Sequence, residues 1–152
     1  MTAYFVNKPN NKKLLVIEDA KIFWTNFRGI ATDKNAEGHR HFCVTLPEDI
    51  AEELIEEGWN VKWTKPKKEG YEPEPYIDVN ISWAIKPPYT AFIRGDEDIE
   101  FGEDLIGDLD TSEIVYIEMA INPSYKSGKP KGYVDSLRVE LYEDPVRGRR
   151  RR

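Results

Sequence analysis

The feature that most constrains this chain is a set of short segments in which apolar and polar residues alternate. Tyr76 to Trp83 (YIDVNISW) places four apolar side chains on one face, and Glu113 to Asn122 (EIVYIEMAIN) repeats the pattern. A period of two is typical of a β-strand with one buried face. Stretches rich in Gly and Pro separate these segments, which indicates short strands joined by turns.

The same pattern predicts five further strands, over 14–27, 41–46, 61–65, 89–94 and 133–142. The segment 14–27 is long and is interrupted at Glu18-Asp19, which predicts a bend or bulge within it. The loop 28–40 contains two glycines, so the strands that flank it are expected to pair as a hairpin.

One α-helix is predicted over 47–57 (PEDIAEELIEE). Pro47 suits a first helical turn, carboxylates fill the early positions, and Gly58 follows the end of the segment. Ile50, Leu54 and Ile55 form its predicted buried stripe, while six carboxylates face water.

About seven strands and one helix predict a mainly β fold, a small OB-like β-barrel or sandwich in which 47–57 is the one clear helix. With 152 residues, the chain is expected to contain a loose arm over 1–13, a single OB-like domain over 14–144 and a basic tail over 145–152. Neither a membrane-spanning segment nor a signal peptide is evident, and there is a single cysteine, so a reducing cytoplasm is expected.

Charge is segregated along the sequence. The net charge is −6, but residues 48–57 hold six acidic side chains and 96–118 hold ten, with no Lys or Arg in either stretch. The rest of the chain carries 12 acidic against 22 basic residues. Because a polyanion responds to the local field, this distribution leaves nucleic acid as a candidate partner.

The stretch GWNVKWTKPKK (58–68) combines aromatic rings with positive charge. A single-stranded nucleic acid needs both, since its bases stack on aromatics and its phosphates attract cations. Trp59 directly follows the helix and is expected to anchor it to the barrel. On a regular strand, Lys62 and Trp63 point to opposite faces, so one ligand does not meet both unless the strand twists or bulges.

Several motifs resemble a family of bacteriophage single-stranded-DNA-binding proteins. The resemblance runs through AKIFWTNFRG (20–29), GHRHFCV (38–44), GWNVKW (58–63), PYIDVNIS (75–82) and KPP (86–88), and less closely through NPSY (122–125) and 129–134. It covers about positions 16 to 140 and implies a variant OB fold that protects replication or recombination intermediates without catalysis. Such proteins commonly end in an acidic tail, whereas this chain ends in RGRRRR.

The expected ligand is single-stranded DNA or RNA, bound without sequence preference. The stacking candidates are Trp24, Phe27, Trp63 and Tyr125, and the phosphate candidates are Arg28, Arg40, Lys62, Lys65, Lys67, Lys126, Lys129 and Lys131. The phosphate candidates lie in three loops, 26–40, 62–68 and 126–131. No cofactor and no metal are expected. Replication or recombination proteins are candidate partners, and the oligomeric state stays open.

Two other function classes remain open. Without the five arginines of 147–152 the net charge is −11, so the chain could be an acidic decoy or scaffold that binds another protein, with 48–57 and 96–118 on one surface. A metal-dependent enzyme is the second. His39 and His41 share a face, and 96–110 is rich in carboxylates. This run lacks the spacing of a calcium loop, and Cys43 lacks an oriented partner for nucleophilic catalysis.

Overall fold

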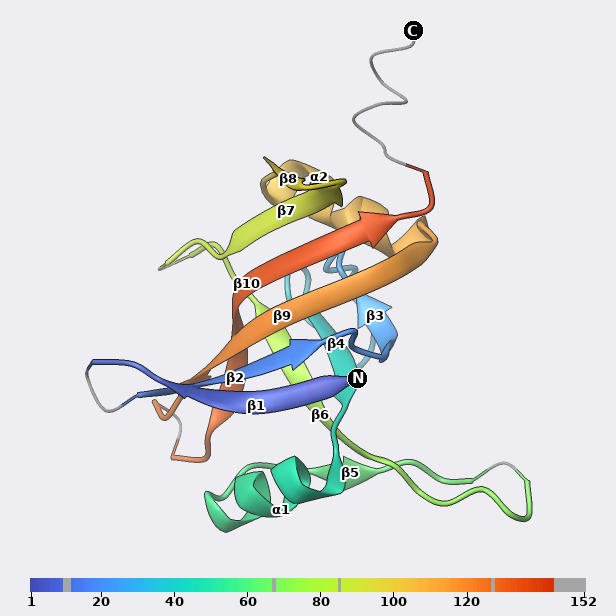
Figure 1. Cartoon of the computed structure of the whole chain (residues 1–152), viewed down its shortest axis with the longest axis vertical. Helices are drawn as coiled ribbons and strands as arrows, with labels where there is room; N and C mark the ends of the chain where they lie inside the picture. Colours follow the sequence, from blue (N-terminus) through green and yellow to red (C-terminus); the bar gives the residue numbers. More distant parts are fainter. Residues whose placement is uncertain (10–11, 67, 85, 127, 144–152) are drawn as a thin grey trace, which may run out of the picture.

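The computed structural model describes residues 1–9, 12–66, 68–84, 86–126 and 128–143, and these form ten strands of one sheet with three short helices (Figure 1). The strands are β1 (Thr2–Asn7), β2 (Lys13–Glu18), β3 (Ile22–Asn26), β4 (Arg40–Thr45), β5 (Lys62–Trp63), β6 (Pro75–Ile81), β7 (Tyr89–Arg94), β8 (Glu97–Glu100), β9 (Ile114–Ser124) and β10 (Lys131–Leu141). The helices are α1 (Glu48–Glu56), α2 (Glu103–Ile106) and the 3-10 helix η1 (Gly107–Thr111). The mainly β prediction is confirmed.

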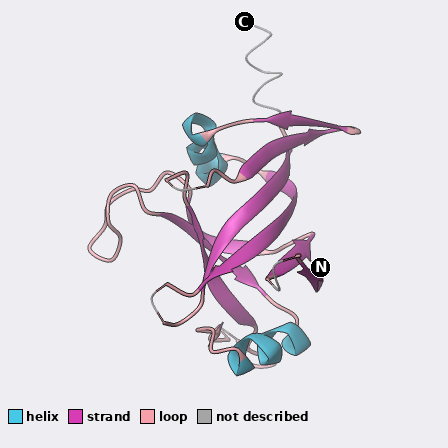
Figure 2. Ribbon diagram, turned by 90° about the vertical axis from the view of Figure 1, so that its left-hand side faces the viewer, coloured by secondary structure: helices cyan, strands magenta, loops and turns pink. Residues whose placement is uncertain are grey.

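The sheet is curved but not closed. Its strand order is β1-β2-β9-β10-β6-β4-β3, with β5 beside β6, β7 beside β10, and β8 beside β7. β10 pairs with β6 at its start and with β7 further on, and its pairing with β9 shifts register between Val134 and Ser136. Figure 2 shows β9 and β10 as the long, curved strands that connect the two ends of the molecule.

The core lies on one side of this sheet and includes residues of β2, β4, β6, β9 and β10. The apolar residues of β6 (Ile77, Val79 and Ile81) are all buried, as their alternation predicts. On β9, Ile117 is buried as expected, but Val115 is 54% exposed because β9 begins at the rim of the sheet.

The structure has ten strands where seven were predicted, because 14–27 divides into two strands and because β8 and β1 were not predicted. The segment 14–27 divides into β2 and β3 at Asp19, whose φ of 51° ends the extended conformation. Residues 97–100 form β8, which pairs with β7 across a two-residue turn. β3 pairs antiparallel with β4, so the predicted hairpin around 28–40 is confirmed.

The expectation of a loose arm over 1–13 is wrong. β1 pairs antiparallel with β2 along its whole length, and Ala3 and Phe5 pack against the core. Pairing with the free edge of β2 gives β1 backbone hydrogen bonds along one of its sides. The basic tail 145–152 lies outside the described residues, and the 14–144 domain boundary stays a prediction.

Helix α1 confirms the helix predicted over 47–57, but one residue of its predicted buried stripe is exposed. Ile50, Ala51 and Leu54 are buried, whereas Ile55 is 48% exposed and does not belong to the buried stripe. Trp59 is buried, as expected of an anchor after the helix. Within the described part of the chain, no helix is long and apolar enough to cross a membrane.

Leu54 and Ile55 offer a matched test of this helix orientation. Leu54→Ala should lower the free energy of unfolding by about 2–5 kcal/mol, because it leaves a cavity under α1. Ile55→Ala should change it by less than about 0.5 kcal/mol, since the side chain faces water. Urea denaturation of both variants measures the difference, and equal losses would contradict the orientation of α1.

Candidate nucleic-acid interface

The strand register builds a second, outward face on the opposite side of the core strands. On β6, Tyr76, Asp78 and Asn80 alternate with the buried residues and therefore point outward. Thr45, Cys43 and His41 lie directly across from them on β4. We call the outer face the outward surface formed by Phe23, Trp24, His39, His41, Lys62, Tyr76, Asp78, Asn80, Lys131 and Tyr133.

An aromatic cluster occupies one end of the outer face. Trp24 lies edge-on to Phe23 and Tyr76, with ring centroids 4.9 and 5.7 Å away, and Phe23 lies 5.0 Å from Tyr76. Trp24 is 68% exposed, whereas Tyr76 is buried beneath its neighbours. A large exposed ring supported from below by two others is a stacking surface for a nucleobase.

The backbone at Trp24 holds this ring outward. Trp24 has a φ of 48°, which a non-glycine residue rarely adopts, and it lies where β3 shifts register between Phe23 and Asn26. Such a conformation costs about 1–3 kcal/mol and tends to occur at functional positions.

A stacked histidine pair continues the outer face beyond the aromatic cluster. The rings of His39 and His41 lie 4.9 Å apart with an interplanar angle of 17°. His39 contacts the side-chain oxygens of Asn35 and Asn80 at 2.8 and 2.6 Å, and His41 contacts Asp78 at 2.9 Å. These contacts fix the positions of both rings on the outer face.

Two lysines from different predicted loops border the outer face. Lys62 pairs across from Tyr76, so its side chain projects beside the aromatic cluster. Gly132 faces the core, which turns Lys131 and Tyr133 outward, and Tyr133 pairs with Asn80 on β6. The register thus places cations next to aromatic rings on one surface.

The pKa of the Cys43 thiol depends on burial and on two charged residues of this surface. Burial raises the pKa of Cys43 to about 11, and the Asp78 carboxylate adds to the increase. The positive charge of Lys62 acts in the opposite direction, which is consistent with its place over the outer face.

One predicted stacking residue is wrong. Phe27 is fully buried and stacks on Phe42 at 5.3 Å in the core. The irregular pairing between Phe23 and Asn26 changes the alternation that the sequence predicts, so Phe27 points inward.

The two predicted arginines lie away from the outer face. Arg28 contacts Thr111, and its backbone N–H donates to Asp110. Arg40 donates to the carbonyl oxygen of Phe27 and lies 3.8 Å from Glu103. Both guanidinium groups therefore face the acidic α2–η1 region.

The other predicted residues are exposed but divided between surfaces. Trp63 pairs across from Pro75, on the opposite side of β5 from Lys62. As expected of a regular strand, the two side chains therefore point to opposite faces, and one ligand on the outer face does not meet both. Lys65 follows β5. The remaining exposed candidates lie at the β9–β10 hairpin: Tyr125, Lys126 and Lys129. Lys67 lies outside the described residues.

Sequence reasoning missed several members of the site as nucleic-acid-binding residues: Phe23, His39, His41, Tyr76, Asn80 and Tyr133. The signal for Tyr76 was present, because the polar half of the β6 alternation is Tyr76, Asp78 and Asn80. Tyr133 joins the outer face only through the parallel pairing of β10 with β6, which no local pattern indicates.

The metal-site alternative concerned His39 and His41. The described residues contain no group of three or more His, Cys, Asp or Glu side chains arranged to hold a metal ion. His39 and His41 instead bond to amide and carboxylate oxygens of the sheet.

An open, curved sheet that presents aromatic rings beside lysines has the architecture of an OB-like single-strand-binding protein. Residues 5–143 match the family model described as "Putative phage ssDNA-binding domain". The match covers most of the chain, and the protein therefore belongs to this family of phage single-stranded-DNA-binding domains.

Solved structures share the fold. The single-stranded DNA-binding protein from bacteriophage Enc34 in complex with ssDNA is 13% identical, with a TM-score of 0.54 over 95% of this chain and 98% of that one. Its C-terminal truncation is 12% identical, with a TM-score of 0.52 over the same shares of both chains. A third structure of the Enc34 protein is 11% identical, with a TM-score of 0.51 over 95% of this chain and 93% of that one. No curated protein matches the chain significantly.

Alkylation of Cys43 tests the geometry of the outer face. Because the thiolate is the reactive form and the pKa is raised from 9.0 to about 11, the folded chain at pH 8 should react with iodoacetamide about 100-fold more slowly than the urea-unfolded chain. Lys62→Gln should slow the folded chain further and leave the unfolded chain unchanged. Equal rates for folded and unfolded protein by mass spectrometry would contradict this geometry.

Proposed function

We propose that the outer face binds single-stranded DNA independently of sequence, by stacking bases on the Trp24 cluster and by pairing phosphates with lysines. The observation that carries this proposal is Trp24, a largely exposed ring that is supported by Phe23 and Tyr76 and lies close to Lys62. Every base has a π-face, so such a surface does not require a particular sequence.

The path along the outer face is long enough for several nucleotides. From Tyr76 to Asn80 it extends four residues along β6, or about 13 Å. Lys62 pairs with Tyr76 at the start of this path, and Lys131, one residue before the Gly132–Val79 pair, lies beside its middle. A strand following β6 would therefore meet aromatic and histidine rings on the sheet and cations along one side.

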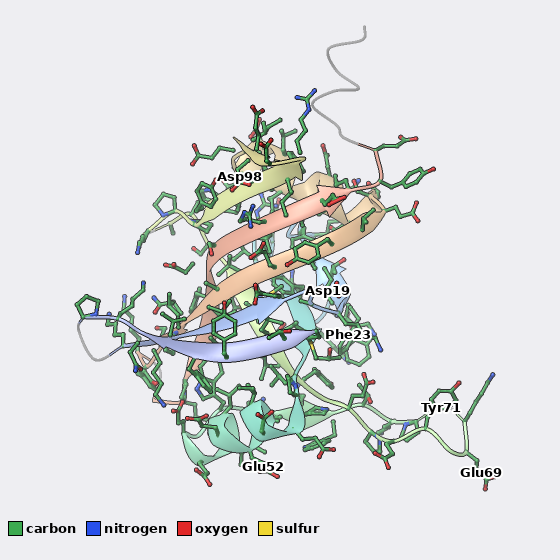
Figure 3. All side chains as sticks on the ribbon, viewed as in Figure 1. Asp19, Phe23, Glu52, Glu69, Tyr71 and Asp98 are labelled. Carbon is green, nitrogen blue, oxygen red and sulfur yellow. The ribbon has the colours of Figure 1, made fainter. Side chains whose placement is uncertain are left out.

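The positions of the acidic regions are consistent with this path of the strand along β6. α1 and the α2–β8 region lie at opposite ends of the molecule, as Figure 3 shows through Glu52 and Asp98. Arg138, which lies at the second of these ends, donates to Asp98 and Glu118 and is neutralised there. The two acidic ends would repel a polyanion and leave the surface between them as its route.

The acidic decoy hypothesis required both acidic stretches on one surface. Their separation in Figures 1 and 2 contradicts that arrangement. It leaves single-strand binding as the function that the geometry favours.

The biological setting follows from this role. We infer that the protein protects single-stranded intermediates of phage DNA replication or recombination in the host cytoplasm, without catalysing a reaction. RNA presents the same stacking faces and phosphates, so discrimination between DNA and RNA requires contacts to the sugar.

Loss of the Trp24 ring should weaken binding strongly. Trp24→Ala should reduce affinity for oligothymidine about 5- to 150-fold, which corresponds to the roughly 1–3 kcal/mol of one base–aromatic stack. Trp63→Ala is the matched control and should change affinity less than about twofold, because Trp63 faces away from this surface. Fluorescence anisotropy measures both, and a larger loss in the control would place the strand elsewhere.

Binding should also depend on salt through Lys62 and Lys131. The slope of log affinity against log salt should become shallower by about 1.4 in Lys62→Gln/Lys131→Gln, since each phosphate contact on a single strand contributes about 0.7. The charge-matched control Lys34→Gln/Lys68→Gln removes two exposed lysines outside this face and should leave the slope unchanged. Equal slopes in both double variants would exclude these phosphate contacts.

A further inference from the structure

Strand β1 forms one free margin of the sheet. It pairs with β2 along its whole length, and no described strand lies along its other side. None of its residues is buried, and its two large outward side chains, Tyr4 and Val6, are 42% and 40% exposed. Figure 1 shows β1 in dark blue as the last strand of the sheet, beside β2 and above α1. The backbone of β1 is therefore accessible from one side.

The other margins of the sheet, in the part of the chain that the structure describes, are protected against a further strand. β3 is interrupted by a register shift after Phe23 and by the positive φ of Trp24. Three of the four residues of β8 are acidic, and β5 has only two residues. Bulges, charges and short length are the devices that protect exposed sheet edges. β1 (TAYFVN) has none of them, because it is uncharged, six residues long and regular in register.

The hydrogen-bond phase of the β1–β2 hairpin identifies the backbone groups at this margin. The N–H of Lys8 donates to the carbonyl oxygen of Lys12, so in this register the even-numbered residues of β1 exchange bonds with β2. The odd-numbered residues therefore direct their N–H and C=O groups away from β2. These residues are Ala3, Phe5 and Asn7. They present a row of donors and acceptors to which another strand can pair.

We propose that a second copy of this chain pairs with this margin, β1 against β1, antiparallel about a two-fold axis at Tyr4. In this register each Ala3 faces Phe5 of the second copy, and these pairs exchange about four backbone hydrogen bonds. Tyr4 lies opposite Tyr4 of the second copy in a non-hydrogen-bonded pair, where side chains approach most closely and aromatic pairs are favourable. No charged residue of β1 is placed opposite another, because β1 contains none.

The charges of the hairpin favour a second copy in the antiparallel direction. The turn carries Lys8, which lies 3.7 Å from Asp135, and the exposed Lys12. The open end carries Glu18 and Asp19. Antiparallel pairing brings the turn of each copy beside the open end of the other, so that cationic and acidic ends meet. The margin is therefore complementary to itself, as the interface of a two-fold symmetric dimer requires.

The interface is small, so the dimer is a reversible one. Pairing of one short strand from each copy buries less than the roughly 1,200 Å² of stable complexes, and we expect a dissociation constant of about 10–100 μM. The net charge of −6 on each copy opposes association at low ionic strength. Dimerisation is therefore best measured at about 0.15 M salt, where this repulsion is screened.

A dimer formed at β1 would carry two outer faces in one assembly. The hydroxyl of Thr45 contacts the sulfur of Met1 at 3.7 Å, and Thr45 lies opposite Tyr76 of the aromatic cluster, so this margin borders the outer face. A nucleic-acid strand that reaches both copies would meet the second face at a raised effective concentration. This consequence rests on the proposed function, whereas the dimer itself does not.

Amide hydrogen exchange of the full chain tests the pairing without any substitution. At about 1 mM protein the amides of Ala3 and Phe5 should exchange about four- to sixfold more slowly than at about 20 μM, because only the dimer bonds them. The amides of Tyr4 and Val6 are bonded to β2 in both states. They are the internal control and should show the same protection at both concentrations in NMR.

Tyr4→Lys provides the matching variant. It sets two like charges opposite each other across the axis, so sedimentation velocity should show a dissociation constant at least about tenfold higher. Retained protection of the Val6 amide would show that β1 of this variant still pairs with β2. Val115→Lys adds the same charge at an exposed apolar residue of β9, outside β1, and should leave the dissociation constant unchanged.

The outcomes separate this inference from the proposed function, because the test uses no nucleic acid. A chain that stays monomeric at about 1 mM, with exchange at Ala3 and Phe5 independent of concentration, would overturn the dimer and leave the outer face intact. A dimer that persists undiminished in Tyr4→Lys, or that leaves these two amides unprotected, would equally exclude pairing through β1. A chain that dimerises as expected but fails to bind oligothymidine would contradict the proposed function alone.

Discussion

The close approach of β10 to the core at Gly132 is the contact on which the rest of this structure depends. A Cβ atom at Gly132 would lie 2.9 Å from Ile121 and 3.1 Å from the Trp59 ring, so only glycine fits without displacement. This position lets β10 pair with β6, and the Asn80 side chain donates to the Gly132 carbonyl oxygen. Trp59, which anchors the end of α1, fills the space below.

The same pairing assembles the binding surface from distant parts of the sequence. It sets Lys131 and Tyr133 beside the outward residues of β6, while β5 adds Lys62 and β3 adds Trp24. Glu52 of α1 and Asp98 of β8 lie at opposite ends of the molecule (Figure 3). A protein with a net charge of −6 can thereby offer a strand a route on which cations and aromatic rings meet.

Local patterns predicted the positions of the strands and of α1 better than they predicted which side chains of these elements are buried. Alternation in β6 and the acidic, proline-initiated segment of α1 identified both elements and most of their buried residues. Phe27 and Ile55 were misassigned, because a register shift in β3 and the final orientation of α1 depend on packing and not on local period. The roles of Tyr76 and Tyr133 depend on which strands become neighbours, and no single segment encodes that.

Photo-crosslinking tests the central claim most directly, because it locates the strand without removing any side chain. A short oligonucleotide of 4-thiothymidine, bound to the full chain and irradiated, should crosslink to Trp24, Phe23 or Tyr76, with weaker products near Tyr133, as identified by mass spectrometry of the digested complex. Crosslinks confined to Trp63 or to the α2–η1 region, with none on the outer face, would contradict the account.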